Sequence, residues 1–481
     1  MQFNPRYNTL DSKLFHQQEA SVLHGAKAGH FNADLAKALN WSETDMAEWV
    51  EICSGQKTFT EFKPLAMVYA GHQFGQWAGQ LGDGRGLLIA QILDQENKTI
   101  DLHLKGAGST PYSRMGDGRA VLRSVIREYL AGHALNSLGV PSSNAVGFTS
   151  SDQGVQREKL ERGAMMLRTS DCHIRLGHFE WINQYQPTLL KDFTQKCIEW
   201  HYPECLETDQ PVLAFATQVI QRTAVMISHW QLVGFAHGVM NTDNLNITGS
   251  TLDFGPYGFM ERFRPNWINN HSDHHGRYTY QQQPSIGHSN LWQWLNNLVP
   301  LCPENIDKEQ WKDELAKCLE HFEPTFLEHY KLGLSQKMGL PSFHHDSFDC
   351  SMAFLRILQS EQLDYTQSFI RLQNKEYDAL KDDCLDRFAF ENFLTQYQNI
   401  RGTQDIEQLD RDMKKANPRY ILRNHMAQKA IELAEANDFS EVERLFTLLS
   451  QPFTAQLDLE KPEDLAPLPS DVPEVMVSCS S

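Results

Sequence analysis

The chain has 481 residues, of which 41% are hydrophobic and 22% are charged, a balance typical of a globular protein. It carries 43 lysine and arginine residues against 61 aspartate and glutamate residues, giving a formal net charge of −18. A general nucleic-acid binder needs clustered basic charge to neutralise phosphates, so the charge balance excludes that class. The length favours two or three packed units over a single core.

The first residues, Met1 to Tyr7, lack a basic stretch followed by an apolar run, and no segment approaches 18 continuous apolar residues. We therefore expect a cytoplasmic protein that binds no membrane. The nine cysteines are odd in number and contain no Cys-x-x-Cys pair, which is typical of a reducing compartment. We further expect a monomer that binds no nucleic acid.

In chain order, the predicted elements begin with residues 1–64, an N-terminal extension with a short helical pattern at 33–39. Residues 65–180 carry Gly-rich loops and short strands, of which 86–93 and 99–104 are the clearest. One helix, 119–135, interrupts these strands.

The larger part, residues 181–456, has mainly helical periodicity, for instance at 212–233 and 421–436. Ser440 and Glu443 have the spacing of a capping box. The remaining residues, 457–481, are acidic and Pro-rich and predict an extended tail.

A Gly-rich segment, Gln-Leu-Gly82-Asp-Gly84-Arg85-Gly, directly precedes the strand at 86–93. Glycines at such a position let backbone N–H groups approach phosphates, although a hairpin turn without a ligand explains the pattern about equally well. Lys105 ends the next strand, where the alternation of Leu102 and Leu104 places it on the opposite face. In a kinase-type lobe that face covers the nucleotide.

Glu128 continues the apolar stripe of the helix at 119–135 instead of facing water. A buried carboxylate needs a cation, and Lys105, 23 residues earlier, is the proposed partner, as in the strand-lysine and helix-glutamate pair of kinases. The alternative is a pair within the helix with Arg123 or Arg127. Neither arginine has the spacing of three or four residues that such a pair needs.

Arg168 and Arg175 have guanidinium groups suited to bidentate phosphate binding, but their spacing alone favours surface salt bridges. Asp117 and Gly118 directly precede the predicted helix. Taken singly, Asp117 is better explained as the N-cap of that helix.

The sequence His237-Gly-Val239-Met-Asn-Thr-Asp243-Asn244 is followed by Leu-Asp253-Phe-Gly. A kinase catalytic loop has the pattern His-x-Asp-x-x-x-x-Asn, in which the aspartate is the base and the asparagine binds a metal ion. A later Asp-Phe-Gly aspartate holds the metal that bridges the phosphates. Val239 occupies the base position here, so Asp243 is the obvious substitute base, with Asn244 and Asp253 as metal ligands.

Two His-rich runs, His271 to His275 and His344 to Asp346, contain metal-ligand residue types. Consecutive positions rarely converge on one ion without a helical spacing, so the sequence disfavours a transition-metal site in either run.

Several motifs in fixed order closely resemble the selenoprotein O family, also called YdiU. They are Gly-His-Gln-Phe-Gly (71–75), Gln-Leu-Gly-Asp-Gly-Arg (80–85), Leu-Lys-Gly-Ala-Gly-x-Thr-Pro-Tyr-Ser-Arg (104–114), His-Gly-Val-Met-Asn-Thr-Asp-Asn (237–244) and Asn-His-Ser-Asp (270–273). The resemblance covers almost the whole chain. It implies an α+β, protein-kinase-like two-lobed fold, with a small β-rich N-lobe that carries one key helix and a larger helical C-lobe.

The resemblance also implies an activity. Members of that family bind ATP in a reversed orientation and transfer AMP to Ser, Thr or Tyr hydroxyls of proteins. The residues implied to contact the nucleotide are Gly82, Gly84, Arg85, Lys105, Asp117, Gly118, Arg168, Arg175 and Asp253. Asn244 and Asp253 would bind Mg²⁺ or Mn²⁺, and Asp243 would accept the proton. Negative charge from Asp83 and Asp117 near the Gly-rich segment is consistent with the reversed orientation.

Cys479 matches the position of a redox cysteine or selenocysteine in family members, and an exposed thiol there would allow regulation by a disulfide. No cysteine lies between Cys205 and Cys302 to serve as a partner in the activation-loop region. Three other functions stay open at this point. They are a catalytically inactive nucleotide-binding scaffold, conventional phosphorylation, and UMP transfer from UTP.

Overall fold

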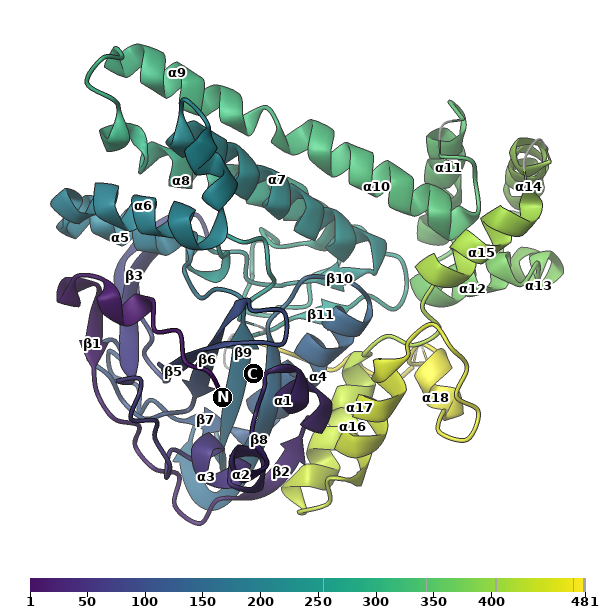
Figure 1. Ribbon diagram of the computed structural model, residues 1–481. Coiled ribbons are helices and arrows are strands. Elements are labelled where there is room, and N and C mark those ends of the chain that lie inside the picture. Colours follow the sequence, from purple (N-terminus) through teal and green to yellow (C-terminus); the bar gives the residue numbers. More distant parts are fainter. Residues whose placement is uncertain (254, 343, 403–404, 470, 479–481) are drawn as a thin grey trace.

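An antiparallel sheet forms one side of the molecule, and helices cover it and extend beyond it (Figure 1). The computed structural model describes residues 1–253, 255–342, 344–402, 405–469 and 471–478. The strands of the large sheet are β1 (Phe15–Gln17), β2 (Lys27–Phe31), β3 (Leu65–Gln73), β4 (Gln76–Gly82), β5 (Gly86–Leu93), β6 (Thr99–Lys105), β7 (Ala120–Val121), β8 (Asn144–Gln156) and β9 (Leu160–Ser170). A second, two-stranded sheet pairs β10 (Phe235–Ala236) with β11 (Gly258–Phe259).

The helices follow the strand-rich part, except for four that lie within it. Those four are α1 (Ala33–Ala38), α2 (Glu43–Ala47), α3 (Trp49–Cys53) and α4 (Leu122–Ser137). The others are α5 (Leu176–Tyr185), α6 (Leu190–His201), α7 (Pro211–Leu232), α8 (Gln283–Asn296), α9 (Lys308–Leu319), α10 (Phe322–Met338), α11 (Ser347–Ser360), α12 (Tyr365–Gln373), α13 (Tyr377–Asp382), α14 (Arg387–Arg401), α15 (Ile406–Ala416), α16 (Asn424–Glu435), α17 (Ser440–Ser450) and α18 (Pro462–Leu465).

The main path of the large sheet is β1-β3-β5-β6-β9-β8-β2, so both outer strands come from the first 31 residues. β1 pairs with β3 at one edge, and β2 pairs with β8 at the other. Residues 1–64, which the sequence suggested as an extension, therefore complete the sheet on both sides. Short strands at both edges leave few unpaired backbone groups on the sheet.

The two strands that the sequence predicted most clearly are present as β5 and β6, joined by a tight turn. The Asp94 carboxylate accepts hydrogen bonds from the backbone N–H groups of Glu96 (2.9 Å) and Lys98 (2.8 Å). Asn97 in that turn adopts a left-handed φ of 59°, which asparagine tolerates well. The hairpin places Lys105 opposite Gly86, directly after the Gly-rich segment.

The predicted helix at 119–135 begins three residues later than expected, and this overturns one interpretation. Ala120 and Val121 pair with Ala164 and Gly163 of β9, so the helix starts at Leu122 with Val121 as its N-cap. Asp117 is therefore not the N-cap. Its carboxylate instead accepts a hydrogen bond from the Arg119 N–H (2.9 Å).

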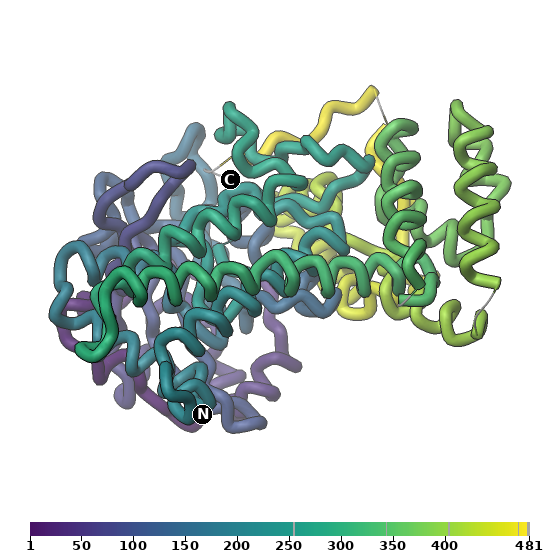
Figure 2. Tube along the Cα trace, turned by 90° about the horizontal axis from the view of Figure 1, so that it is seen from above, coloured from purple at the N-terminus to yellow at the C-terminus, as the bar shows by residue number. Residues whose placement is uncertain are grey.

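Two apolar cores hold the structure together. The larger joins the sheet, α4 to α9 and α16 to α17, and the smaller joins α10 to α15 around Phe354, Phe369 and Tyr397. In both views the N-terminal strands lie at one end of the molecule and α14 at the other, with α10 spanning much of the distance (Figures 1 and 2). Helices predicted at 33–39, 212–233 and 421–436 are present as α1, α7 and α16.

The expected capping box at Ser440 and Glu443 is absent. Ser440 is the first residue of α17, and its N–H is bonded to the Asp438 carboxylate (3.0 Å). The Glu443 carboxylate instead contacts Nε2 of the buried His30 (2.8 Å). The Glu443 side chain therefore contacts His30, a residue distant in sequence, instead of capping its own helix.

The segment expected to be an extended tail is packed onto the body of the protein. It contains α18, and the buried Asp464 carboxylate contacts Arg444 at 2.8 and 3.0 Å. Further along, the His271 N–H donates to the Val477 carbonyl (2.9 Å), and Val477 is buried. Acidic residues here serve as ion-pair partners, which composition alone does not reveal. Cys479 lies outside the described residues.

Among the described residues, no helix has both the length and the apolar character needed to cross a membrane.

Candidate functional site

The two motif loops meet because a short pair of strands frames them. The loop 237–244 directly follows β10, and the loop around Asp253 directly precedes β11. Antiparallel pairing of Phe235 with Phe259 and of Ala236 with Gly258 therefore holds both loops at the same end of the pair. A contact of 3.0 Å between His237 Nε2 and the Leu252 carbonyl ties them together.

A cleft of about 820 Å³ lies between these loops and the large sheet. Every residue that the sequence proposed for nucleotide, metal or proton contact lines it: Gly82, Gly84, Arg85, Lys105, Asp117, Gly118, Arg168, Arg175, Asp243, Asn244 and Asp253. Glu128 does not line the cleft but lies behind Lys105, with which it pairs. Segments more than 150 residues apart in the sequence thus meet at one place.

The cleft is rich in cations although the protein is strongly acidic. Seven cationic side chains line it, against four carboxylates. The cations are Arg85, Lys105, Arg114, Arg119, Arg157, Arg168 and Arg175, and the carboxylates are Asp83, Asp117, Asp243 and Asp253. A site of this charge attracts a polyphosphate, whereas the net charge of −18 would repel one from most of the surface.

At the floor of the cleft, buried ions form a connected chain. Lys105 pairs with Glu128, and the Arg168 guanidinium contacts Glu128 at 2.5 Å and Asp253 at 2.8 Å. Arg175 pairs with the other oxygen of Asp253. Arg168 and Arg175 are buried, so the surface-salt-bridge interpretation of these two arginines is wrong.

The pKa values follow from this chain of ions. Burial alone would raise the pKa of the Glu128 carboxyl, but Arg168 and Lys105 hold it below its usual value. Asp253 is likewise held well below its usual pKa by Arg175 and Arg168, against the opposing effect of burial. Burial lowers the pKa of Lys105 to about 8, although Glu128 opposes this shift. The site therefore has its carboxylates ionised at neutral pH.

Asp253 adopts a left-handed backbone conformation with a φ of 59°. Such a conformation is uncommon for a residue with a Cβ, and strained residues of this kind concentrate at functional sites. The conformation turns the chain so that the Gly255 N–H reaches the Asp253 carbonyl (2.9 Å).

Gly118 approaches the backbone of Gly108 more closely than any other residue type would allow. Its φ is +68°, and a Cβ there would lie 2.0 Å from the carbonyl carbon of Gly108. Next to it, the Asp117 carboxylate forms a bidentate pair with Arg157 at 2.8 and 3.0 Å. Because Arg157 offsets this charge, Asp117 gives little support to the charge argument for a reversed nucleotide.

Asp243 lies on the 3₁₀-helix η5 (Thr242–Asn244), where its side chain is buried. One carboxylate oxygen, Oδ2, accepts a hydrogen bond from Gln73 Nε2 (3.0 Å), whereas the other, Oδ1, is buried without a hydrogen-bond partner. Burial raises the pKa of Asp243 to about 6, with Gln73 and Arg175 opposing the shift. The carboxylate is thus ionised at neutral pH and can accept a proton.

Asn244 and Asp253 suit a hard divalent cation. The Asn244 amide N–H donates to the Val239 carbonyl (3.0 Å), which leaves its side-chain oxygen as a donor atom for a metal. Both Asp253 oxygens contact arginines, but a carboxylate has about four lone-pair sites and can accept more partners. Amide and carboxylate oxygens are the ligands that Mg²⁺ and Mn²⁺ prefer, so the residues fit the expected ion.

Three further residues line the cleft without an individual role in the sequence analysis, namely Gln73, His103 and Asn241, and Tyr278 lies behind Asn241. Gln73 and His103 line it directly, as does Asn241, whose side-chain oxygen accepts from the Tyr278 hydroxyl (2.5 Å). The sequence signal for Gln73 was its place in the motif Gly-His-Gln-Phe-Gly. For Tyr278 no local signal exists, because its contact depends on the fold.

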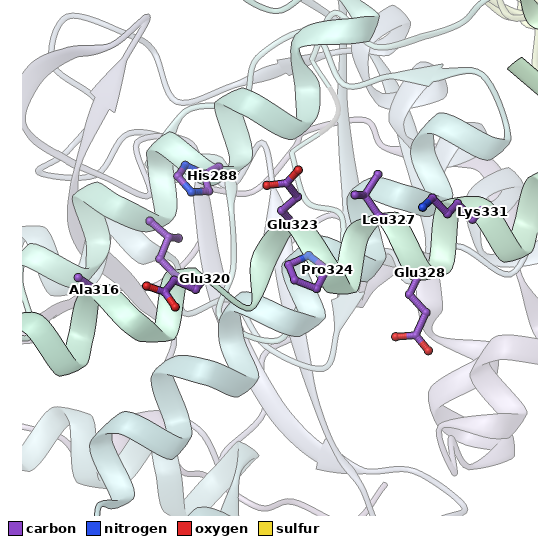
Figure 3. A pocket seen from close by; sticks show the side chains of 9 residues that line it. His288, Ala316, Glu320, Glu323, Pro324, Leu327, Glu328 and Lys331 are labelled. Carbon is purple, nitrogen blue, oxygen red and sulfur yellow. The ribbon is translucent and has the colours of Figure 1, made fainter. Parts of the chain in front are cut away.

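A second cavity, of about 760 Å³, lies among α8, α9 and α10 (Figure 3). Glu320, Glu323 and Glu328 line it together with His288. Among the described residues that line it, Lys331 is the one lysine or arginine. Carboxylates of this density repel phosphates, so this cavity does not suit a nucleotide.

Of the two His-rich runs, the second brings its ligand atoms together. His344, His345 and Asp346 each offer one ligand atom, and these atoms lie within 4.8 Å of one another. However, His344 Nδ1 already accepts a hydrogen bond from the Asp346 N–H (3.2 Å).

The eight cysteines in the described ranges are all free thiols.

Known proteins match this chain over most of its length. A family model described as "Protein adenylyltransferase SelO" matches residues 1–450. A "Protein nucleotidyltransferase YdiU" from Pectobacterium atrosepticum is 42% identical over 472 residues, which are 96% of this chain and 95% of the relative. A protein of the same description from Yersinia pseudotuberculosis serotype O:1b is 41% identical over 100% of this chain and 99% of its own length. Another from Vibrio cholerae is 40% identical over 99% of this chain and 98% of its own length.

Proposed function

The chain belongs to the protein adenylyltransferase SelO family and is a nucleotidyltransferase, and on this basis we propose that it transfers AMP from ATP to Ser, Thr or Tyr hydroxyls of proteins. Pyrophosphate is released, and the reaction depends on Mg²⁺ or Mn²⁺. The observation that carries this proposal is the cation-rich cleft in which the two motif loops meet the Gly-rich segment.

The proposal includes a protein-kinase-like arrangement of two lobes. Residues 65–180 form the nucleotide-binding lobe, and residues 181–456 form the helical lobe with the catalytic and metal-binding loops. The pair of Lys105 with Glu128, and the meeting of Asn244 with Asp253 in one cleft, support this arrangement.

In the proposed reaction the chain's own residues bind and orient the nucleotide. Lys105, Arg168 and Arg175 contact phosphate oxygens, and Arg85 of the Gly-rich segment adds a further cation. The Asp83 and Gly84 N–H groups of that segment instead donate to the carbonyls of Met67 (2.9 Å) and Gly82 (2.7 Å). Asn244 and Asp253 hold the divalent ion, which when bound neutralises charge on the phosphates. Asp83 and Asp117 border the same cleft without a proposed proton role.

The group transfer needs one base and no redox step. The acceptor oxygen forms a bond to the α-phosphorus, and the bond from that phosphorus to the bridging oxygen breaks, so pyrophosphate leaves with the electron pair. The hydroxyl proton passes to the carboxylate of Asp243, which lines the cleft. General-base catalysis of this kind contributes about 10²- to 10⁴-fold to a rate.

Labelled nucleotides test the proposal. The protein is incubated with casein, which offers many exposed hydroxyls, and with ATP labelled at the α- or the γ-phosphate. Protein-bound label from the α-form alone, lost on adding a chelator and in Asp243→Ala and Asp253→Ala, is the expected result. Label from the γ-form alone would show phosphorylation, and label from neither would show a binding scaffold.

A parallel reaction with α-labelled UTP identifies the nucleotide. Equal or greater incorporation from UTP would replace AMP transfer by UMP transfer. Restoring the chelated enzyme with Mg²⁺ and, separately, with Mn²⁺ identifies the ion that supports the reaction.

A further inference from the structure

The hairpin of β3 and β4 reaches across the cleft and contacts the loop that carries Asp243. Its tip turns between Gln73 and Gln76. Three consecutive hairpin residues each contact this loop. The His72 N–H donates to Thr242 Oγ1 (2.8 Å), and the Phe74 N–H donates to Asn241 Oδ1 (3.2 Å). Between them, Gln73 is the residue that uses its side chain.

From this geometry we propose that Gln73 is a positioning residue, whose side-chain amide holds Oδ2 of Asp243 and so keeps the carboxylate of the proposed base oriented at the wall of the cleft. The proposal rests on the function proposed above. It adds a residue to which no role in the reaction has been given.

The hydrogen bonds around Asp243 support this role. The bond from Gln73 Nε2 to Oδ2 is 3.0 Å long, and Oδ1 is buried with no hydrogen-bond partner. The terminal torsion of an aspartate is broad, so a carboxylate without a fixed oxygen samples a wide range of orientations. One hydrogen bond at Oδ2 therefore restricts that torsion.

Backbone packs against Oδ1 and against the main chain of Asp243. A Cβ on Gly71 would lie 2.4 Å from Oδ1 of Asp243, and a Cβ on Gly177 would lie 3.5 Å from the Asp243 Cα. The Asp243 carbonyl also accepts a hydrogen bond from Arg175 (2.6 Å). The backbone of Asp243 is thus fixed by its surroundings, and Gln73 supplies a hydrogen bond to its carboxylate on the side away from Gly71.

A purely structural role for the Gln73 side chain is less consistent with these contacts. The hairpin tip keeps its place through backbone donors, because the Phe74 N–H also donates to the Tyr278 hydroxyl (2.9 Å). None of the contacts made by the His72 and Phe74 N–H groups involves the Gln73 side chain. Replacing that side chain therefore removes the bond to Asp243 and leaves the hairpin anchored.

The test compares Gln73→Met and Gln73→Ala with the wild type in α-label transfer to casein at varied ATP concentration. Both variants lack the donor, so both should lower kcat by about ten- to a hundredfold, while KM for ATP stays within about twofold. Gln76→Ala, an exposed glutamine on the same hairpin, is the matched control and should keep the wild-type kcat. Thermal unfolding of all variants shows whether each is folded.

Other outcomes overturn the proposal in recognisable ways. If Gln73→Met keeps the wild-type kcat and only Gln73→Ala loses it, the side chain acts by packing. If KM for ATP rises in proportion to the loss of kcat/KM, Gln73 binds the nucleotide instead. A wild-type enzyme that transfers no α-label refutes the proposed function and this inference with it, whereas an active wild type with two unaffected Gln73 variants refutes this inference alone.

Discussion

Adding one methyl group at Gly71 should displace the proposed base without touching the nucleotide-binding residues. Gly71 lies in β3, and its φ is outside the left-handed region, so alanine is acceptable to the backbone. A Cβ at this position would lie 2.4 Å from Oδ1 of Asp243 and 3.0 Å from both its Cβ and its Cγ. Ordinary contact begins at 3.4 Å, so Oδ1 must move by about 1.0 Å.

A misplacement of about 1 Å costs roughly 10²-fold in rate, equivalent to about 2.7 kcal/mol in the activation free energy. We therefore expect Gly71→Ala to lower kcat for AMP transfer by roughly 10²-fold. Its dissociation constant for ATP, measured by calorimetry, should remain within about twofold of the wild type. The three atoms nearest to the added methyl group all belong to Asp243, and none belongs to Lys105, Arg168 or Arg175.

Gly402→Ala is the control for a glycine-to-alanine change far from the motif loops. Gly402 ends α14 with a φ of −63°, and the nearest atom to an added Cβ is 3.3 Å away. This variant should turn over at the wild-type rate. A Gly71→Ala enzyme that does the same would refute the reasoning, since the position of Asp243 would then not matter to the reaction.

Three further predictions concern buried charges. Glu128→Gln leaves Lys105 and Arg168 without their shared carboxylate and should lower the free energy of unfolding by about 3–5 kcal/mol in urea titrations, whereas Glu309→Gln, which removes an exposed partner of Lys312, should change it by less than about 1 kcal/mol. Burial lowers the pKa of Lys337 from 10.5 to about 7, so the unfolded chain binds more protons than the folded chain between these pH values, and the wild type loses stability as the pH falls through them. Lys337→Met should therefore be more stable than the wild type by about 3 kcal/mol at pH 7, a value that allows for the lost contact of Lys337 with the Phe369 ring (4.4 Å). Above pH 10.5 the same urea titrations should show little difference in stability. A variant that is no more stable at pH 7 than at pH 10.5 would show that Lys337 is not buried as described. Asp464→Ala leaves Glu441 as the carboxylate partner of Arg444 and should loosen the segment 457–478, so limited proteolysis should cleave there at least about tenfold faster than in wild type. Equal cleavage rates would show that the pair of Arg444 with Asp464 does not hold the segment.

Patterns with a short period predicted their part of the structure well. The alternation along β6 placed Lys105 on the cleft side, and the helical stripe of α4 placed Glu128 behind it, because both periodicities follow directly from backbone geometry. The spacing in the loop 237–244 likewise put Asp243 and Asn244 beside the cleft, where both line its wall.

Contacts between distant segments were beyond the reach of local patterns. Nothing near Ser440 indicates that Glu443 will contact His30 rather than cap its own helix. The spacing of Arg168 and Arg175 suggested surface positions because it gives no information about Asp253, a carboxylate about 80 residues away that offsets the cost of burying both arginines. The acidic composition of residues 457–481 suggested an extended chain, since a single partner such as Arg444 is invisible to a compositional argument.

The edge strand β2 has a consequence for the order of assembly. Synthesis proceeds from the N-terminal end, so β2 leaves the ribosome long before β8, the strand with which it pairs. Glu443, the partner of His30 in β2, is made roughly 300 residues after β8. Contacts this remote in the sequence are slow to form, because the intervening chain must first be brought together. The β1 strand can pair with β3 soon after its own synthesis, whereas β2 stays unpaired until β8 has been made and must meanwhile be kept from pairing with other chains.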